Sequence, residues 1–198
     1  MKQEERTDQE LVKEILEGNP QIFQTIIANT QGLVISIVYK MIKNEEDRKD
    51  LMQEVYLKVY GKLASFRFKA KLSTWIGTIA YNTCLNYLAK KKIPILKVTD
   101  GKEKETWESI ETQLPTNFKN QPEGELFKKE RAEILTVEIA NLSPLYKTLI
   151  TLYHQKELSY KEIGQITGLT EGTLKSYLFR ARKELKDRLL AKYKKEDL

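Results

Sequence analysis

The chain has 198 residues, of which 40% are hydrophobic and 31% charged, and this composition supports small helical cores beneath a large solvated surface. It holds one cysteine, Cys84, and one histidine, His154, which excludes an intramolecular disulfide, the usual Cys/His zinc sites and histidine-based triads. No run of about 18 apolar residues predicts a membrane span. The acidic, polar N-terminus is unlike a signal peptide, and the single cysteine fits a reducing cytoplasm.

The net charge of +6 is unevenly distributed. By residue range, the net charges are −4 (1–54), +9 (55–99), −4 (100–125) and +5 (126–198). The second range contains no acid at all, whereas solvated surfaces usually mix both signs. Two basic blocks separated by an acidic one therefore predict two contacts with a single polyanion.

Helical patterns fill the first part of the chain. Thr7 begins a capping box, T-D-Q-E, for a helix that ends near Gly18. Asn19 and Pro20 supply a cap and a first-turn proline for the next helix, which the apolar residues of 33–42 continue as a buried core helix. Asn44 is expected to cap a helix at about 46–63, and a break near 64–71 precedes a helix at about 73–91.

Periodicity fails between residues 92 and 121, where prolines, a glycine and many acids predict a linker. Helical patterns resume from 123 to about 140 and again at Ser143-Pro144. No strand pattern or internal repeat is found. We therefore expect an all-α protein with two small helical domains, residues 1–93 and 123–198, joined by a flexible acidic linker at 94–122.

The C-terminal domain has the pattern of a helix-turn-helix at residues 158–185. Ser159 can cap a short helix, Gly168 suits a tight turn with positive φ, and Thr170 can cap the following helix. Leucines at 174, 178, 185 and 189 give that second helix an apolar stripe, and basic residues lie off it. This arrangement is typical of entry into a DNA major groove, although an ordinary helical hairpin shows similar patterns.

Aromatic and basic residues alternate in the acid-free block, residues 55–99. Flat side chains beside cations suit single-stranded or melting DNA, because exposed bases stack and phosphates need neutralising. Trp75, Asn82 and Asn86 recur at spacings that put them on one helix face. Trp75 could instead be a core tryptophan, or it could be half-buried with one edge presented.

Three motifs, in order, give the chain a resemblance to the sigma-70 family, in its small extracytoplasmic-function (ECF) group. DLMQEVYLKVYGKLASF at 50–66 resembles the family's segment that grips core RNA polymerase. STWIGTIAYNTCLNYLAKKK at 73–92 resembles the segment that melts and reads the minus-ten element, and GTLKSYLFRARKEL at 172–185 resembles the reader of the minus-thirty-five element. The resemblance covers nearly all of the chain.

The resemblance implies three sets of contacting residues. The polymerase-binding residues would be Asp50, Gln53 and Glu54, although a merely solvated helix face has the same composition. The minus-ten residues would be Phe66, Arg67, Trp75, Asn82, Asn86 and Lys90. The minus-thirty-five residues would be Thr173, Lys175, Ser176, Phe179, Arg180 and Lys183, with Arg182 on a phosphate or in solvent.

The resemblance also implies the partners: core RNA polymerase, promoter DNA and an anti-sigma factor. No cofactor, metal or small-molecule substrate is expected, and no catalysis. The acidic linker would thread the polymerase cleft or would serve as a disordered tether. Phe68 and Lys69 depart from the glycine and acid usual after Phe66-Arg67, which affects base preference, and Tyr177 replaces a common basic residue.

Two other functions compete with this interpretation. A free-standing regulator would bind its operator through the helix-turn-helix alone, and it would leave the acid-free block without a purpose. A nucleic-acid enzyme, such as a recombinase with a helix-turn-helix tail, would need grouped carboxylates, a phosphate loop or an activated serine, and the sequence offers none.

Overall fold

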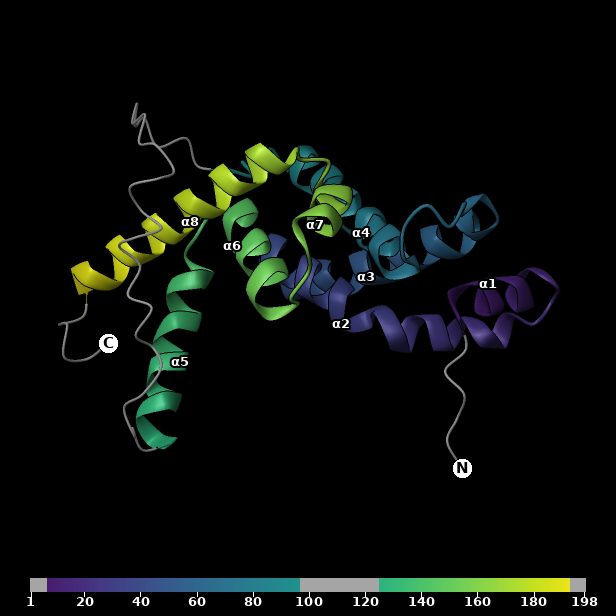
Figure 1. Cartoon of the computed structure of the whole chain (residues 1–198), viewed down its shortest axis with the longest axis horizontal. Helices are drawn as coiled ribbons and strands as arrows, with labels where there is room; N and C mark the ends of the chain where they lie inside the picture. The colour runs from purple at the N-terminus through teal and green to yellow at the C-terminus, as the bar shows by residue number, and fades with distance from the viewer. Residues whose placement is uncertain (1–6, 97–124, 193–198) are drawn as a thin grey trace.

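The computed structural model describes residues 7–96 and 125–192, and these residues form helices and no strand. Almost all of the expected linker, residues 97–122, lies outside the described residues. The helices are α1 (Asp8–Leu16), α2 (Phe23–Met41), α3 (Glu45–Lys62), α4 (Leu72–Lys90), α5 (Glu125–Ala140), α6 (Pro144–Ile150), α7 (Tyr160–Thr167) and α8 (Glu171–Lys192). A short 3₁₀ turn, η1 (Pro20–Ile22), precedes α2, and another, η2 (Leu63–Ser65), follows α3. A π-helical turn, η4 (Thr151–Gln155), follows α6 (Figure 1).

In the N-terminal domain, side chains cap two of the helices as expected. Thr7 and Glu10 form a capping box at α1, and the Asn44 carboxamide oxygen accepts from the amide of Asp47 at 3.0 Å to begin α3. Asn19 makes no side-chain cap bond, so that expectation is wrong: the chain there enters a 3₁₀ turn at Pro20 before α2 begins. Helices α2, α3 and α4 pack on one another and enclose the apolar core.

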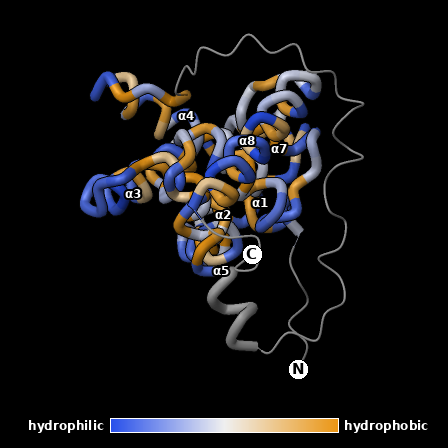
Figure 2. Tube along the Cα trace, turned by 90° about the vertical axis from the view of Figure 1, so that its left-hand side faces the viewer, coloured by the Kyte–Doolittle hydropathy of each residue, from blue (hydrophilic) through white to orange (hydrophobic). Residues whose placement is uncertain are grey.

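Helix α2 with its preceding turn, Pro20–Met41, is long and apolar enough to cross a membrane by length and composition alone, and it is the one such helix among the described residues. Its buried residues, which include Ile26, Val34 and Ile37, contribute to the core that α3, α4 and α6 share. Figure 2 shows this helix in the middle of the bundle with apolar stretches along it. In this fold it is therefore a core helix.

The C-terminal domain consists of α5 to α8. The Ser143 hydroxyl caps α6 with Pro144 in its first turn, and Ser159 and Glu162 form a capping box at α7. Gly168 ends α7 with φ 75°, a left-handed conformation that glycine adopts at low cost. Gly164 is also needed, because a Cβ atom there would lie 3.0 Å from the carbonyl oxygen of Leu169.

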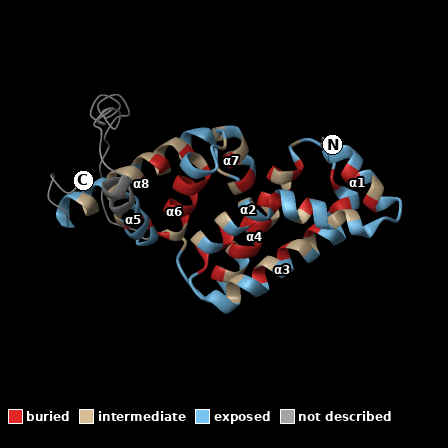
Figure 3. Cartoon of the chain, turned by 90° about the horizontal axis from the view of Figure 1, so that it is seen from below, coloured by how far each residue is buried: buried red, intermediate tan, exposed pale blue. Residues whose placement is uncertain are grey.

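The two domains are in direct contact, which the sequence did not indicate. Helix α7 packs on α4 and α6 packs on α2, and Figure 3 shows buried residues along these helices. The approach is close at Gly77 of α4, where a Cβ atom would lie 3.0 Å from a side-chain carbon of Ile166. The amide of Leu145 also donates to the carbonyl of Ile95 at 3.0 Å. The domains are thus joined by packing as well as by the chain.

Candidate polymerase and nucleic-acid interfaces

An exposed stripe runs along α3. Asp50, Gln53 and Glu54 all lie on its surface, while Leu51 and Val55 point into the core. Glu54 pairs with Lys58 of the next turn at 2.6 Å, so part of its charge is already balanced. The expected polymerase residues are thus accessible and close together.

Two apolar residues on the same stripe escaped the sequence interpretation. Leu57 is 74% exposed and Tyr60 is 49% exposed, and both follow Gln53 and Glu54 at helical spacing. Single exposed apolar residues are ordinary, but two adjacent ones bordered by polar groups are typical of a binding surface. The signal in the sequence was the position of Leu57 opposite Leu51, Val55 and Val59.

The acid-free block places its polar residues along one side of α4. Asn82, Asn86 and Lys90 are exposed. Trp75 lies on the same face of α4, seven positions before Asn82. It is half-buried, so it belongs partly to the core and partly to the surface. Carboxamides and an ammonium group in a row can meet base edges and a phosphate on one strand.

The segment before α4, which holds Phe66 and Arg67, forms a cluster of tilted aromatic rings with Trp75. Phe66 is only 7% exposed, and its ring centroid lies 5.0 Å from that of Trp75 and 4.6 Å from that of Phe68. Arg67 is exposed. Phe66 therefore supports the surface from beneath, and Phe68 is the more accessible ring.

The helix-turn-helix is built as its sequence pattern predicts. The Thr170 hydroxyl accepts from the amide of Thr173 at 3.3 Å, which caps α8. Leu174 and Leu178 are fully buried, whereas Leu185, further along, is half-buried. The cap and the packing of α8 on α6 and α7 fix the angle at which α8 leaves the turn. They thereby determine which face of α8 points outward.

The outward face of α8 carries the expected minus-thirty-five residues. Arg180 is exposed, and Thr173, Lys175, Ser176, Phe179 and Lys183 are half-exposed. Lys175 pairs with Glu171 at 2.7 Å and lies over the ring of Tyr160, 5.5 Å from its centroid. Its ammonium group must change partner to reach a phosphate.

Arg182, expected on a phosphate or in solvent, and Tyr177 both make contacts within the protein. Arg182 donates to the His154 ring at 3.3 Å and lies over the ring of Tyr153, so it ties α8 to η4. Burial, and then the Arg182 charge, lower the pKa of His154, so the ring stays neutral beside the guanidinium. Tyr177, where a basic residue is common, packs its ring against Tyr146 instead.

An ion pair between the domains was also missed. Lys71, at the start of α4, meets the Glu162 carboxylate of α7 at 2.8 Å. Hydrogen bonds from Lys71 and then from Ser159 lower the pKa of Glu162 to about 2. Beside them the Thr78 hydroxyl donates to the carbonyl of Gln165 at 3.1 Å. Partners so distant in sequence leave no local signal.

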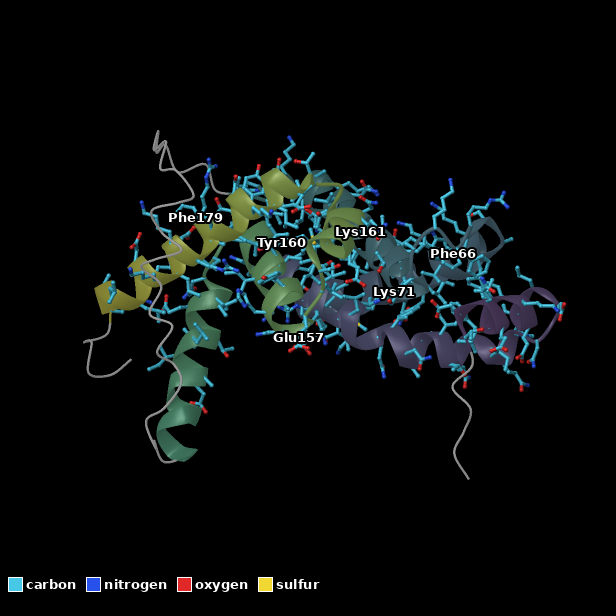
Figure 4. All side chains as sticks on the ribbon, viewed as in Figure 1. Phe66, Lys71, Glu157, Tyr160, Lys161 and Phe179 are labelled. Atoms are coloured by element: carbon cyan, nitrogen blue, oxygen red, sulfur yellow. The ribbon has the colours of Figure 1, made fainter. Side chains whose placement is uncertain are left out.

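The two candidate nucleic-acid surfaces lie apart. Figure 4 shows Phe66 toward the end of the molecule that holds α1 and Phe179 toward the opposite end on α8, with Lys71 and Tyr160 between them. The exposed face of α4 and the outward face of α8 are therefore separate contacts presented by one chain. This arrangement suits two positions along a duplex better than one.

Comparison with known proteins identifies the arrangement. Residues 26–93 match the family model for sigma-70 region 2, and residues 132–185 match that for sigma-70 region 4. The ECF RNA polymerase sigma-E factor of Haemophilus influenzae is 31% identical over 187 residues, which cover 94% of this chain and 97% of that protein. The chain belongs to the sigma-70 family. The ECF RNA polymerase sigma-E factor of Escherichia coli K12 is 32% identical, over 94% of this chain and 96% of that protein. Both relatives support the assignment of this sigma factor to the ECF group.

Solved structures share the fold. CnrH, solved in complex with the cytosolic domain of CnrY, has a TM-score of 0.62 at 16% identity, over 92% of this chain and 97% of that one. The sigma factor RpoE from Bartonella quintana, in complex with the anti-sigma factor NepR, has a TM-score of 0.57 at 21% identity, over 86% and 98%. The all-α architecture of this sigma factor is therefore that of its family.

Proposed function

We propose that this sigma factor directs initiation by dividing the work among three surfaces: α3 binds core RNA polymerase, the exposed face of α4 reads and opens the minus-ten element, and α8 docks on the minus-thirty-five duplex. The observation that carries the proposal is that two basic parts of the sequence, 55–99 and 126–198, form separate regions of one chain, and that the first of them contains no acid and many aromatic residues. A free-standing regulator that binds its operator through the helix-turn-helix alone would need only the surface on α8.

The α3 surface suits a protein partner. Its acidic and amide groups can complement a basic helical surface, and Leu57 and Tyr60 supply apolar area that a partner would bury. Charge complementarity steers the encounter, and the apolar centre contributes most to slow dissociation. We therefore add Leu57 to the polymerase-binding residues Asp50, Gln53 and Glu54.

The α4 surface suits strand opening. Unstacking a base costs a few kcal/mol, and stacking it on an aromatic side chain returns about 1–3 kcal/mol. Trp75 offers a half-buried ring, and the carboxamides of Asn82 and Asn86 can each donate and accept along a base edge. Lys90 would neutralise a phosphate of the same strand.

The α8 surface suits duplex recognition. Arg180 and Lys175 can reach phosphates or guanine edges, and Phe179 can pack on a thymine methyl group. Thr173 and Ser176 lie near the N-terminal end of the helix, which is the end that enters the groove in helix-turn-helix proteins. Lys183 would meet the phosphate backbone.

The remaining assignments concern the setting of the protein. Sigma factors are initiation factors rather than enzymes, and we expect no catalytic activity, cofactor or metal in this one. Because its partner would be RNA polymerase, we place its action in the cytoplasm. The two solved relatives are held by CnrY and by an anti-sigma factor, and we infer a corresponding anti-sigma partner here.

Reconstituted transcription tests the proposal. Purified core RNA polymerase is incubated with the protein and AT-rich promoter fragments, and specific transcripts and footprints are measured with and without core. We expect specific transcripts only when both components are present, and no strong footprint by the protein without core. Footprinting without core, combined with no stimulation of initiation, would establish the free-standing regulator instead.

Variants of α3 separate the polymerase contact from folding. Leu57→Ala and Asp50→Ala should weaken core binding several-fold while melting temperatures stay unchanged, because both side chains are exposed. Lys49→Ala, an exposed neighbour on the same helix, is the matched control and should bind core as the wild type does. Wild-type core affinity in both α3 variants would mean that the stripe is only a solvated face.

A further inference from the structure

Helix α4 begins without a cap of its own. Helices α1, α3, α6, α7 and α8 each start with a serine, threonine or asparagine whose side chain accepts from an amide of the first turn. Lys71, at the corresponding place before α4, makes no such hydrogen bond, and the first turn of α4 contains no acid. Because the first amides of a helix have no partner within that helix, those of α4 need acceptors from elsewhere.

Asp8 of α1 supplies one of these acceptors. Its Oδ2 atom accepts from the amide of Leu72, the first residue of α4, at 2.9 Å, although the two residues are 64 positions apart in the chain. The helix dipole also favours a negative charge at this end of a helix. Helix α1 packs on η2 and holds the carboxylate in place through three buried residues, Leu11, Val12 and Ile15.

The turn that Asp8 caps is the turn that leads to Trp75. The amide of Trp75 donates to the carbonyl of Lys71 at 3.1 Å, which closes the first turn of α4. Without the carboxylate, the Leu72 amide would lose its protein acceptor, and this turn would fray more readily. The position of the half-buried Trp75 ring at the surface of α4 therefore depends on Asp8.

This hydrogen bond lies within the N-terminal domain, unlike the ion pair beside it. Lys71 pairs with Glu162 of α7, and that pair breaks if the domains separate on a promoter. Asp8 and Leu72 both belong to residues 1–93, so their hydrogen bond does not depend on the contact between the domains. Asp8 also precedes residues 26–93, which match the sigma-70 region 2 model. Helix α1 thus constrains α4 from outside the matched residues.

We propose that Asp8 is a positioning residue for promoter opening: its carboxylate fixes the start of α4, and with it the place of Trp75 on the face that meets the minus-ten element. The inference rests on the proposed function and deepens it, because it gives α1 a task beside the three contact surfaces. Asp8 acts through α4 and needs no contact of its own with DNA or polymerase.

Three variants test this role in holoenzyme with core RNA polymerase, well below every melting transition. Asp8→Ala should open a promoter about 3- to 10-fold more slowly, as one lost hydrogen bond predicts, when permanganate reactivity of thymines is followed over time. Asp8→Asn keeps an acceptor oxygen at this place and should restore most of the rate. Thr7→Ala, the matched control, removes the cap of α1 itself, so it should lower the melting temperature similarly and yet open the promoter at the wild-type rate.

Tryptophan fluorescence reports the position of the indole directly. The chain has two tryptophans, so in a Trp107→Phe background all of the tryptophan emission comes from Trp75. Asp8→Ala in this background should make the emission more sensitive to quenching by acrylamide, because a frayed first turn exposes the ring. Asp8→Asn and Thr7→Ala should leave the quenching unchanged. A general loss of stability does not produce this pattern.

The outcomes distinguish the inference from the function on which it rests. If the wild-type holoenzyme opened the promoter and Asp8→Ala opened it equally fast, Asp8 would only stabilise the fold and the inference would be wrong. Equal slowing in Asp8→Ala and Thr7→Ala, or no recovery in Asp8→Asn, would lead to the same conclusion. Failure of the wild-type holoenzyme to open the promoter would overturn the proposed function itself.

Discussion

Burial decides which side chains a ligand or reagent can reach. Phe66 and Phe68 are two positions apart, yet the first is in the core and the second is at the surface. Cys84 shows the same effect on chemistry: its thiol is fully buried in α4, and burial raises its pKa to about 12. A thiol so placed stays protonated at physiological pH and has no access to reagents.

We therefore expect Cys84 to be inert in the folded protein. At pH 8 it should react with an aromatic disulfide reagent far more slowly than a free thiol, and it should react at the free-thiol rate in denaturant. Because its pKa is raised on folding, this thiol should lower stability as the pH rises from about 9 to about 12. Rapid labelling of the native protein at pH 8 would contradict the buried position.

At the scale of helices, local chemistry sets where each element begins. The cap at α7 is an example: the Ser159 hydroxyl accepts from the amide of Glu162 at 3.2 Å, and the Glu162 carboxylate accepts from the amide of Ser159 at 3.0 Å. Both groups lie within four residues of each other, so the motif can be recognised from sequence. Because α7 packs on α8, the cap also helps to position the outward face of α8.

Ser159→Ala should therefore destabilise the protein by about 1 kcal/mol, the usual contribution of a capping hydroxyl. Urea unfolding followed by circular dichroism measures the change. Ser36→Ala is the control, because that hydroxyl bonds to the Gly32 carbonyl inside α2, where alanine is a good helix former. An equal loss of unfolding free energy in the two variants would show that the capping hydroxyl at α7 contributes no more than a serine inside a helix.

Sequence patterns predicted the helices and the helix-turn-helix for the same reason: capping boxes, turn glycines and apolar stripes are encoded within a few residues. Two features were out of reach, because both depend on packing between distant segments: the burial of Phe66 beside the exposed Phe68, and the contact between Gly77 and Ile166. Thr78 and Gln165, for example, are 87 residues apart in the chain.

At the scale of the whole molecule, the packing of α7 on α4 holds the two domains in a closed arrangement. Lys71 belongs to the acid-free block, and here its charge is balanced by Glu162 of the other domain. Contacts at two separate promoter elements require the domains to take positions set by DNA and polymerase. The closed arrangement is therefore expected to open when the holoenzyme binds a promoter.

Locking the domains together tests this expectation. In the variant Thr78→Cys with Gln165→Cys, a short bifunctional maleimide should join α4 to α7, and buried Cys84 should not interfere. The joined protein should lose most promoter-specific transcription, while the same variant without the reagent keeps it. Undiminished transcription from the joined protein would show that the domains need not separate.

The division of labour between α4 and α8 is the central claim, and permanganate reactivity of promoter thymines measures it most directly. At saturating holoenzyme, Asn82→Ala should bind the promoter but show roughly tenfold less reactivity, since a hydrogen bond to an exposed base is lost. Arg180→Ala should bind the closed duplex more weakly, and the slope of log affinity against log salt concentration should fall by about 1. At saturation this variant should still reach wild-type permanganate reactivity. The controls are Asn29→Ala, an exposed asparagine on α2, and Lys186→Ala, an exposed basic residue on α8, and both should match the wild type in both assays. Equal loss of duplex binding and of reactivity in the Asn82 and Arg180 variants would contradict the account.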